Sequence, residues 1–252
     1  MGNIINPYRY SATGLKTNLV SCWEFDESSG DLLDKHGSND GTVTGCTRQQ
    51  TEKPSGLNYS YRFNGSSDKI ELGAGSFGSG FTKLTAAIWV KNYSTDDYSC
   101  FFFGKYDFTN DQRSFALRGT VASSHQRPRI SMGEDGTSTT NKDIWRSGDP
   151  AIGTGWRLYV LVFDGTARTG DGTLQGWLNN SNYSSDVDQS TLDDAGYIYD
   201  DATEPIYIGA TTGSTDWFNG YIAQAAYWQD ALSSDLLSTL YSSGSGLAYA
   251  SW

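Results

Sequence analysis

Three polar stretches that combine an aromatic ring with hydrogen-bonding groups are the parts of this sequence best suited to chemistry. They read GKYDFTND, KDIWRSGD and STDWFNG. A pyranose ring has an apolar face that stacks on tryptophan or tyrosine, and aspartate can accept its hydroxyl groups. In each case the ring could instead be packed under its own loop. The candidate carbohydrate-binding residues are therefore Tyr106, Asp107, Trp145, Asp216 and Trp217.

One pair of carboxylates has a spacing that glycoside hydrolysis could use. Glu24 and Asp26 are two residues apart, which would place them on one side of a strand, and retaining glycosidases hold two carboxyls about 5–5.5 Å apart. Roles in a turn or at the surface are the other interpretation. The two histidines, His36 and His125, lie in polar, loop-like sequence, so no serine or cysteine relay is indicated.

A metal site is suggested by one loop only. Asp34, Asn39 and Asp40 could supply hard oxygen ligands to calcium, but the same residue types also form turns. The three cysteines, Cys22, Cys46 and Cys100, are an odd number at no metal-ligand spacing, so we expect reduced thiols. No other motif requires a cofactor, and none is expected.

The elements that must position these residues are short strands. Runs rich in β-branched and aromatic residues recur along the chain, with Gly, Asn, Asp or Ser between them. In residues 84–90 the even-numbered residues form one face and the odd-numbered residues the other, whereas residues 159–163 are apolar on both sides and indicate a strand covered on both faces. One helix is predicted, at residues 233–241, with Ser233 or Ser234 as its N-cap.

The chain is expected to form an arm followed by one domain. Residues 1–18 have no consistent period and are interpreted as an extended N-terminal arm that anchors the protein, and residues 19–252 as the folded body. The net charge of −11 disfavours nucleic acid and anionic lipid as partners. No secretory signal or membrane-spanning run is recognised, which favours synthesis in a cytoplasm. The arm residues expected to make contacts are Ile4, Ile5, Pro7, Tyr8 and Tyr10.

Six short motifs, taken in order, resemble the concanavalin A-like, laminin-G-like (LamG) superfamily. They lie at residues 19–30, 34–45, 61–72, 84–91, 155–166 and 218–241. The first, LVSCWEFDESSG, is similar to the family's W-x-F-D-E-x-S-G. The last, which runs from FNGYI to YWQDALS, is similar to F-D-G-x-I followed by Y-x-R-A-L-S and is the most specific.

This resemblance implies an all-β, two-sheet antiparallel jelly-roll sandwich with one short C-terminal helix and with the first and last strands side by side. The family contains lectins, glycosidase accessory modules, adhesion domains and virion proteins, so it indicates a fold rather than one activity. Two departures matter. Ala223 and Gln224 stand where an acidic pair is usual, and Ser28 stands where the family's glycosidases have a third acid.

The function expected from these features is non-enzymatic. The first hypothesis is a virion structural protein, a capsid-decoration or tail- or fibre-associated jelly roll. It would be held to other virion proteins by its arm and would carry a lectin-like surface for cell-surface glycans. The second is a free carbohydrate-binding lectin or adhesin outside the cell, and the third is a glycoside hydrolase of the same fold. Homo-oligomers are compatible with all three.

Overall fold

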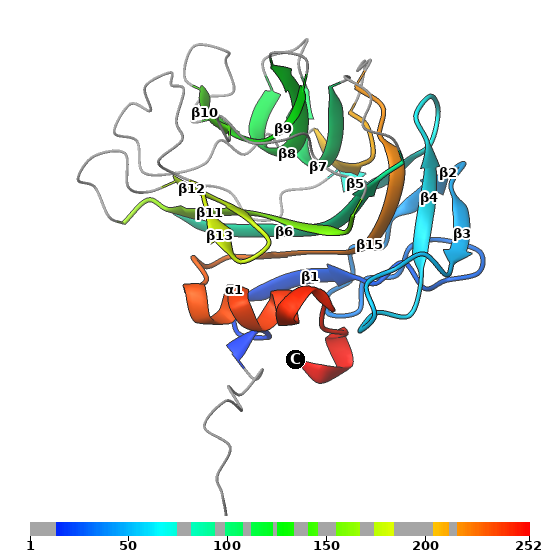
Figure 1. The fold of residues 1–252 in the computed structure, drawn as a ribbon, viewed down its shortest axis with the longest axis horizontal. Coiled ribbons are helices and arrows are strands. Elements are labelled where there is room, and N and C mark those ends of the chain that lie inside the picture. Colours follow the sequence, from blue (N-terminus) through cyan, green and yellow to red (C-terminus); the bar gives the residue numbers. More distant parts are fainter. Residues whose placement is uncertain are drawn as a thin grey trace, which may run out of the picture.

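The computed structural model consists mainly of two antiparallel β-sheets packed face to face, with a short helix on one side (Figure 1). This confirms the predicted all-β sandwich. The structure describes residues 14–74, 82–93, 99–107, 112–122, 125–133, 141–145, 155–166, 174–183, 204–211 and 216–252.

The first sheet contains, among the described residues, eight strands, and the first and last strands of the chain pair within it as expected. Its spatial order is β13-β12-β11-β6-β15-β4-β3, and β1 also pairs with β15. The bounds are β1 Leu19–Trp23, β3 Thr47–Gln50, β4 Ser60–Asn64, β6 Lys83–Asn92, β11 Arg157–Asp164, β12 Leu174–Leu178, β13 Ser181–Asn182 and β15 Asn219–Trp228.

The second sheet contains seven strands in the described part of the chain, in the order β10-β9-β8-β7-β14-β5-β2. The bounds are β2 Thr42–Thr44, β5 Lys69–Ala74, β7 Cys100–Asp107, β8 Gln112–Ala122, β9 His125–Gly133, β10 Asn141–Trp145 and β14 Pro205–Ile208. His125 and the start of the KDIWRSGD stretch, which the sequence predicted to be loop-like, therefore lie in strands β9 and β10. Pro128 inside β9 is one reason, because proline weakens a strand pattern.

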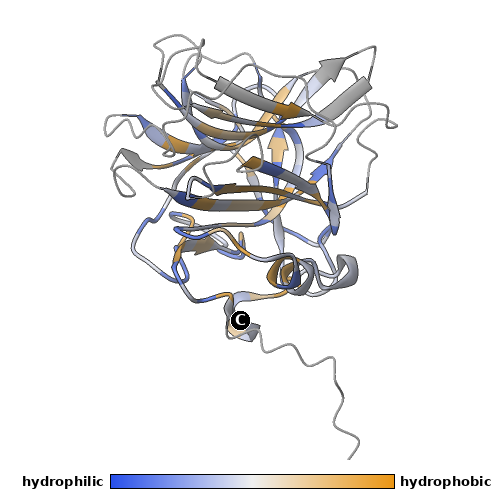
Figure 2. Ribbon diagram, turned by 90° about the vertical axis from the view of Figure 1, so that its left-hand side faces the viewer, coloured by the Kyte–Doolittle hydropathy of each residue, from blue (hydrophilic) through white to orange (hydrophobic). Residues whose placement is uncertain are grey.

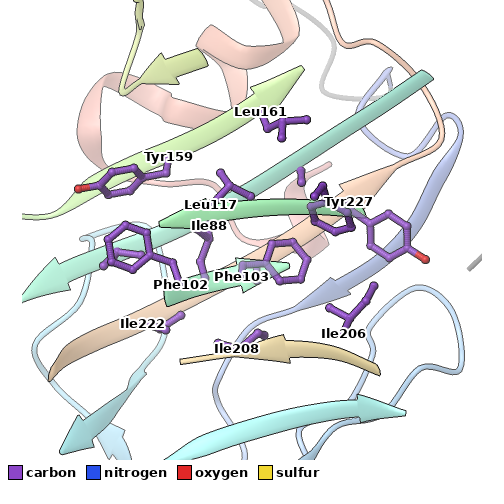
Figure 3. Packing of buried hydrophobic residues seen from close by; sticks show 14 of the residues in the cluster. Ile88, Phe102, Phe103, Leu117, Tyr159, Leu161, Ile206, Ile208, Ile222 and Tyr227 are labelled. Carbon is purple, nitrogen blue, oxygen red and sulfur yellow. The ribbon is translucent and has the colours of Figure 1, made fainter. Parts of the chain in front are cut away.

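The main core lies between the sheets and follows the predicted alternation. The even-numbered residues from Leu84 to Val90 belong to this core, while Ala87 and Trp89 belong to a second cluster on the other side of the first sheet. Aromatic rings fill much of the space, and Phe102 lies 4.7 Å from Tyr159 between ring centroids. Figure 3 shows side chains from both sheets meeting here.

The outer face of the first sheet is covered by the C-terminal part of the chain. Helix α1 (Ser234–Tyr241) begins after its N-cap Ser233, as predicted, and the 3₁₀ turns Ser242–Gly244 and Tyr249–Ser251 follow. The Tyr241 ring stacks on Trp89, and Trp252 stacks on Trp228. Figure 2 shows hydrophobic residues along the strands and in this helical layer. This packing explains why β6 and β11 are apolar on both sides.

The packed part of the chain begins earlier than the predicted boundary at Leu19. Leu15 is fully buried, and its carbonyl oxygen accepts a hydrogen bond of 2.6 Å from Nε1 of Trp228. The backbone N–H of Gln229 donates to the carbonyl of Asn18. Residues 14–18 therefore belong to the body, because they complete the hydrophobic layer under α1. The arm residues Ile4, Ile5, Pro7, Tyr8 and Tyr10 lie outside the described residues.

Two further properties concern membrane spans among the described helices and disulfide bonds among the three cysteines. Among the described helices none has the length and hydropathy needed to cross a lipid bilayer. Cys22 and Cys100 are buried in separate hydrophobic clusters, and Cys46 is partly exposed; all three are free thiols.

Candidate functional site

The outer face of the second sheet carries a small aromatic cluster that is separate from the main core. In β8, Phe115 and Leu117 point into the core, whereas Ala116 between them contacts the outer cluster. Side-chain alternation along the strand explains this division. The outer cluster consists of Phe101, Tyr106, Ala116 and Tyr207.

Basic side chains lie over this cluster. The Arg113 and Arg118 guanidinium carbons are 5.9 and 5.7 Å from the centroid of the Tyr106 ring. On β14, the Tyr207 ring has the Lys69 ammonium 5.2 Å from its centroid. Such cation–ring contacts hold the cations in place. The tyrosines therefore form a floor, and the cations lie nearer to the surface.

Arg118 and Arg129 face each other across neighbouring strands. In the ladder Phe101 is opposite Arg118, Arg118 is opposite Arg129, and Arg129 is opposite Trp145. Residues directly opposite in an antiparallel pair project to the same side. Because Phe101 belongs to the outer cluster, the two arginines also lie on the outer face.

Asp216 joins these arginines from the segment that precedes β15. Its carbonyl oxygen accepts a hydrogen bond of 2.9 Å from the backbone N–H of Phe101. Burial raises the pKa of the Asp216 carboxyl above its ordinary value, and the charges of Arg118 and Arg129 oppose that rise. Trp217 follows and is partly exposed. We call Arg113, Arg118, Arg129, Asp216 and Trp217 the arginine face.

The five predicted carbohydrate-binding residues lie in different parts of the fold, and two of them are not in loops. Asp216 and Trp217 lie outside the strands, as expected, and Asp216 lies beside the arginines. Tyr106 and Asp107 require correction: they lie in β7 rather than in a loop and are 2% and 1% exposed. The reason is that the pairing of β7 with β8 continues through Tyr106 to Asp107, which is opposite Gln112. Trp145 is the last residue of β10, and its side chain lies outside the described part.

The arginines were not predicted as site residues from the sequence. Their signal is the alternation in SFALR and PRISM, where Phe115, Leu117, Ile130 and Met132 point inward and the arginines occupy the intervening positions. A polar residue at such a position is usually solvated, so one strand alone cannot distinguish a binding face from an ordinary surface. Only the ladder brings Arg118 and Arg129 together.

The loop that suggested a calcium site is organised by backbone hydrogen bonds. Oδ1 of Asp34 accepts the N–H groups of Cys22 and His36, both at 3.0 Å, and Oδ2 accepts that of Asn39 at 3.1 Å. Oδ1 of Asp40 accepts the N–H of Asp34 at 2.8 Å. Within the described residues no group of three or more His, Cys, Asp or Glu side chains is placed to hold a metal ion. This geometry supports the turn-forming interpretation.

The possible catalytic pair, Glu24 and Asp26, is also engaged in structural contacts. Oε1 of Glu24 accepts the backbone N–H of Tyr249 at 2.7 Å, and Asp26 forms an ion pair of 2.8 Å with Lys35. Burial raises the pKa of the Glu24 carboxyl, although the Tyr249 N–H opposes the rise. Both residues follow β1, and Phe25 between them has a φ of 55°, so the regular strand alternation ends there.

Only one of the two histidines predicted to lie in loops does so. His125 is the first residue of β9 rather than part of a loop. His36 is in a loop, and its Nδ1 lies 3.1 Å from the Tyr249 hydroxyl.

The comparison with protein families gives a match over most of the chain. A family model described as the concanavalin A-like lectin/glucanases superfamily matches residues 64–238. No curated protein matches the sequence.

Several solved structures share the fold. Domain 4 of AbnA, an extracellular GH43 arabinanase of Geobacillus stearothermophilus solved with arabinotriose, is 16% identical with a TM-score of 0.61, covering 88% of this chain and 97% of that one. The binding domain of Paraclostridial Mosquitocidal Protein 1 is 14% identical with a TM-score of 0.65, covering 91% and 53%. The botulinum neurotoxin serotype D ligand binding domain, solved with N-acetylneuraminic acid, is 10% identical with a TM-score of 0.61, covering 92% and 52%. The chain spans about half the length of these two toxin domains.

Proposed function

Because this chain belongs to the concanavalin A-like lectin/glucanases superfamily, we propose that it is a non-catalytic carbohydrate-binding protein whose ligand face is the arginine face. The observation that carries the proposal is that Asp216, from the segment before β15, lies beside Arg118 of β8 and Arg129 of β9, and that the partly exposed Trp217 follows Asp216 in the chain. An indole ring can stack on a sugar, and carboxylate and guanidinium groups can hydrogen-bond its hydroxyls.

Accessibility decides which groups would contact the sugar. Trp217, Asp216, Arg113 and Arg129 are partly exposed, whereas Tyr106 is buried beneath the arginines. The proposed stacking ring is therefore Trp217. Tyr106, which the sequence suggested for that role, would instead support the arginines from below.

The similar structures support a binding role in general terms. The arabinanase domain was solved with arabinotriose and the serotype D domain with N-acetylneuraminic acid, so this architecture accommodates saccharides. At these identities the likeness concerns the fold alone. The location of the ligand on this chain is our proposal.

A glycan array with two matched variants tests the proposal. Trp217→Ala should abolish or strongly weaken binding, because it removes the proposed stacking ring. Trp156→Ala should bind like wild type. Trp156 is also partly exposed, but it packs against the cluster on the outer face of the first sheet, on the opposite side of the molecule. Binding that survives in Trp217→Ala and is lost in Trp156→Ala would refute the proposed face.

A non-catalytic role is favoured over hydrolysis by the contacts of Glu24 and Asp26 with Tyr249 and Lys35. The test is to incubate the array ligand with wild type and with Glu24→Gln/Asp26→Asn. We expect no hydrolysis by either protein. Hydrolysis by wild type that the double variant lacks would contradict the proposal.

We also propose that the protein is a virion structural component held by its N-terminal arm. The observation that favours this is the place where the described part of the chain begins. Gly14 lies against Leu236 of α1, and Leu15 belongs to the hydrophobic cluster on the outer face of the first sheet, which α1 covers (Figure 1). A protein anchored there would present the arginine face outward.

Deletion of residues 1–13 tests this anchoring. The shortened protein should fold and bind glycans but fail to co-purify with assembled particles. Deletion that leaves particle association intact would remove the anchoring role, and purified particles without the protein would remove the virion assignment.

A further inference from the structure

We infer that the arginine face recognises an acidic saccharide, one that carries a carboxylate or a sulfate ester. This inference rests on the proposed function and narrows its ligand class.

The first reason is the local concentration of positive charge in an acidic protein. The chain has a net charge of −11, yet β8 and β9 bring Arg113, Arg118 and Arg129 to one sheet face. A general solvated surface on such a chain would be expected to be acidic. This concentration of guanidinium groups therefore favours an anionic ligand.

The second reason is the direct juxtaposition of Arg118 and Arg129 in the β-ladder. Like charges directly opposite each other in an antiparallel pair are destabilising. Asp216 lies close enough to both to counter part of that repulsion. An anion bound at this position would interact favourably with both guanidinium groups, so binding an acidic group would stabilise the folded protein.

The third reason is the contact of two of the arginines with the Tyr106 ring. The guanidinium carbons of Arg113 and Arg118 are 5.9 and 5.7 Å from that ring. Guanidinium groups bind carboxylates and sulfates through paired N–H donors in a fixed plane. Because the ring holds two of the three arginines, less side-chain freedom is lost on binding.

The three arginines have different roles in this arrangement. Arg118 is 8% exposed and acts as a positioning residue at the centre of the face. Arg113 and Arg129 are partly exposed and are the groups that would reach the acidic substituent. Trp217 would stack on the sugar that carries it.

Matched ligands test the inference directly. Binding is measured by titration calorimetry for a hexuronate oligosaccharide and its carboxyl-reduced counterpart, and for a sulfated oligosaccharide and its desulfated counterpart. We expect at least one acidic member to bind about tenfold or more tightly than its neutral partner, since hydrogen bonds to charged groups exceed neutral ones. Its affinity should fall as salt is raised. Which pair shows the preference distinguishes a carboxylate ligand from a sulfate ligand.

Variants of single arginines test whether the preference for an acidic ligand arises at the arginine face. Arg129→Gln should weaken the acidic ligand about 10- to 100-fold and the neutral partner much less, because the glutamine amide can still donate to a hydroxyl. Arg129→Lys should fall between wild type and Arg129→Gln for the acidic ligand, because lysine keeps the charge without the paired donors. The control is Arg62→Gln. Arg62 also lies over tyrosine rings, 4.3 Å from Tyr93 and 5.4 Å from Tyr221, but on the first sheet. If Arg129→Gln does not fold, Arg113→Gln replaces it.

The outcomes separate the two proposals. Equal binding of acidic and neutral partners would overturn the acidic-ligand inference and leave the carbohydrate-binding function intact. Equal loss in Arg129→Gln and Arg62→Gln would also overturn it. No binding to any saccharide in these pairs or on the array would overturn both.

Discussion

Replacing Asp34 with alanine should destabilise the fold markedly, because one carboxylate organises the loop after β1. It accepts three backbone N–H groups, from Cys22, His36 and Asn39, at 3.0–3.1 Å. An unsatisfied buried donor costs about 1–3 kcal/mol, but the loop is partly exposed and water can replace some bonds. We therefore expect a loss of about 3 kcal/mol in the free energy of unfolding, which for a protein of this size lowers Tm by about 6–12 °C.

The assay is thermal and urea unfolding of Asp34→Ala, Asp34→Asn and the control Asp31→Ala, an exposed aspartate nearby. Asp34→Asn should lose less, because its amide oxygen can keep the bonds from Cys22 and His36 while its NH₂ meets the N–H of Asn39. Asp31→Ala should match wild type. Added calcium should leave all Tm values unchanged. A wild-type Tm that rises with calcium and no longer does so in Asp34→Ala would refute the turn-forming reasoning and restore the metal site.

Two further predictions concern the body boundary and a buried carboxyl. Deleting residues 1–13 should leave Tm unchanged. Deleting residues 1–18 should lower the free energy of unfolding by about 3–5 kcal/mol, because it removes the buried Leu15 side chain and the hydrogen bond that its carbonyl accepts from Trp228. Equal Tm values for the two shortened proteins would place the boundary of the folded body at Leu19. Burial raises the pKa of the Glu24 carboxyl in the folded protein, so the folded state loses stability as pH rises from below the ordinary pKa of the group to above its raised pKa. The Tm of Glu24→Gln should therefore match that of wild type near about pH 4 and exceed it at about pH 7. A Tm advantage of Glu24→Gln that is largest at acid pH would contradict this reasoning.

Much of the fold could be predicted because the core repeats one simple pattern. The alternation from Leu84 to Val90 and the two-sided run from Tyr159 to Phe163 identified central strands, and Ser233 identified the start of the helix. What covers the outer face of the first sheet was not predictable. Trp252 and Leu15 come from opposite ends of the chain, and only the folded topology brings both to Trp228.

The candidate site was only partly predictable, because its charged residues have meaning only across strands. Asp216 and Trp217 stood out as a ring beside a carboxylate within turn-forming sequence. Arg118 and Arg129 are eleven residues apart on two strands, and each alone resembles a solvated polar position. Tyr106 was interpreted as a loop ring because it stands in the polar stretch GKYDFTND, but the β7–β8 pairing extends through Tyr106 to Asp107.

The most direct test of the central claim follows the indole N–H signals of the eight tryptophans by NMR while a glycan selected on the array is titrated. The signals are assigned by single Trp→Phe variants. We predict that the Trp217 signal shifts with ligand concentration while the Trp156 signal, on the opposite side of the molecule, stays fixed. A shift of Trp156 without a shift of Trp217 would contradict the claim that the outer face of the second sheet binds the ligand.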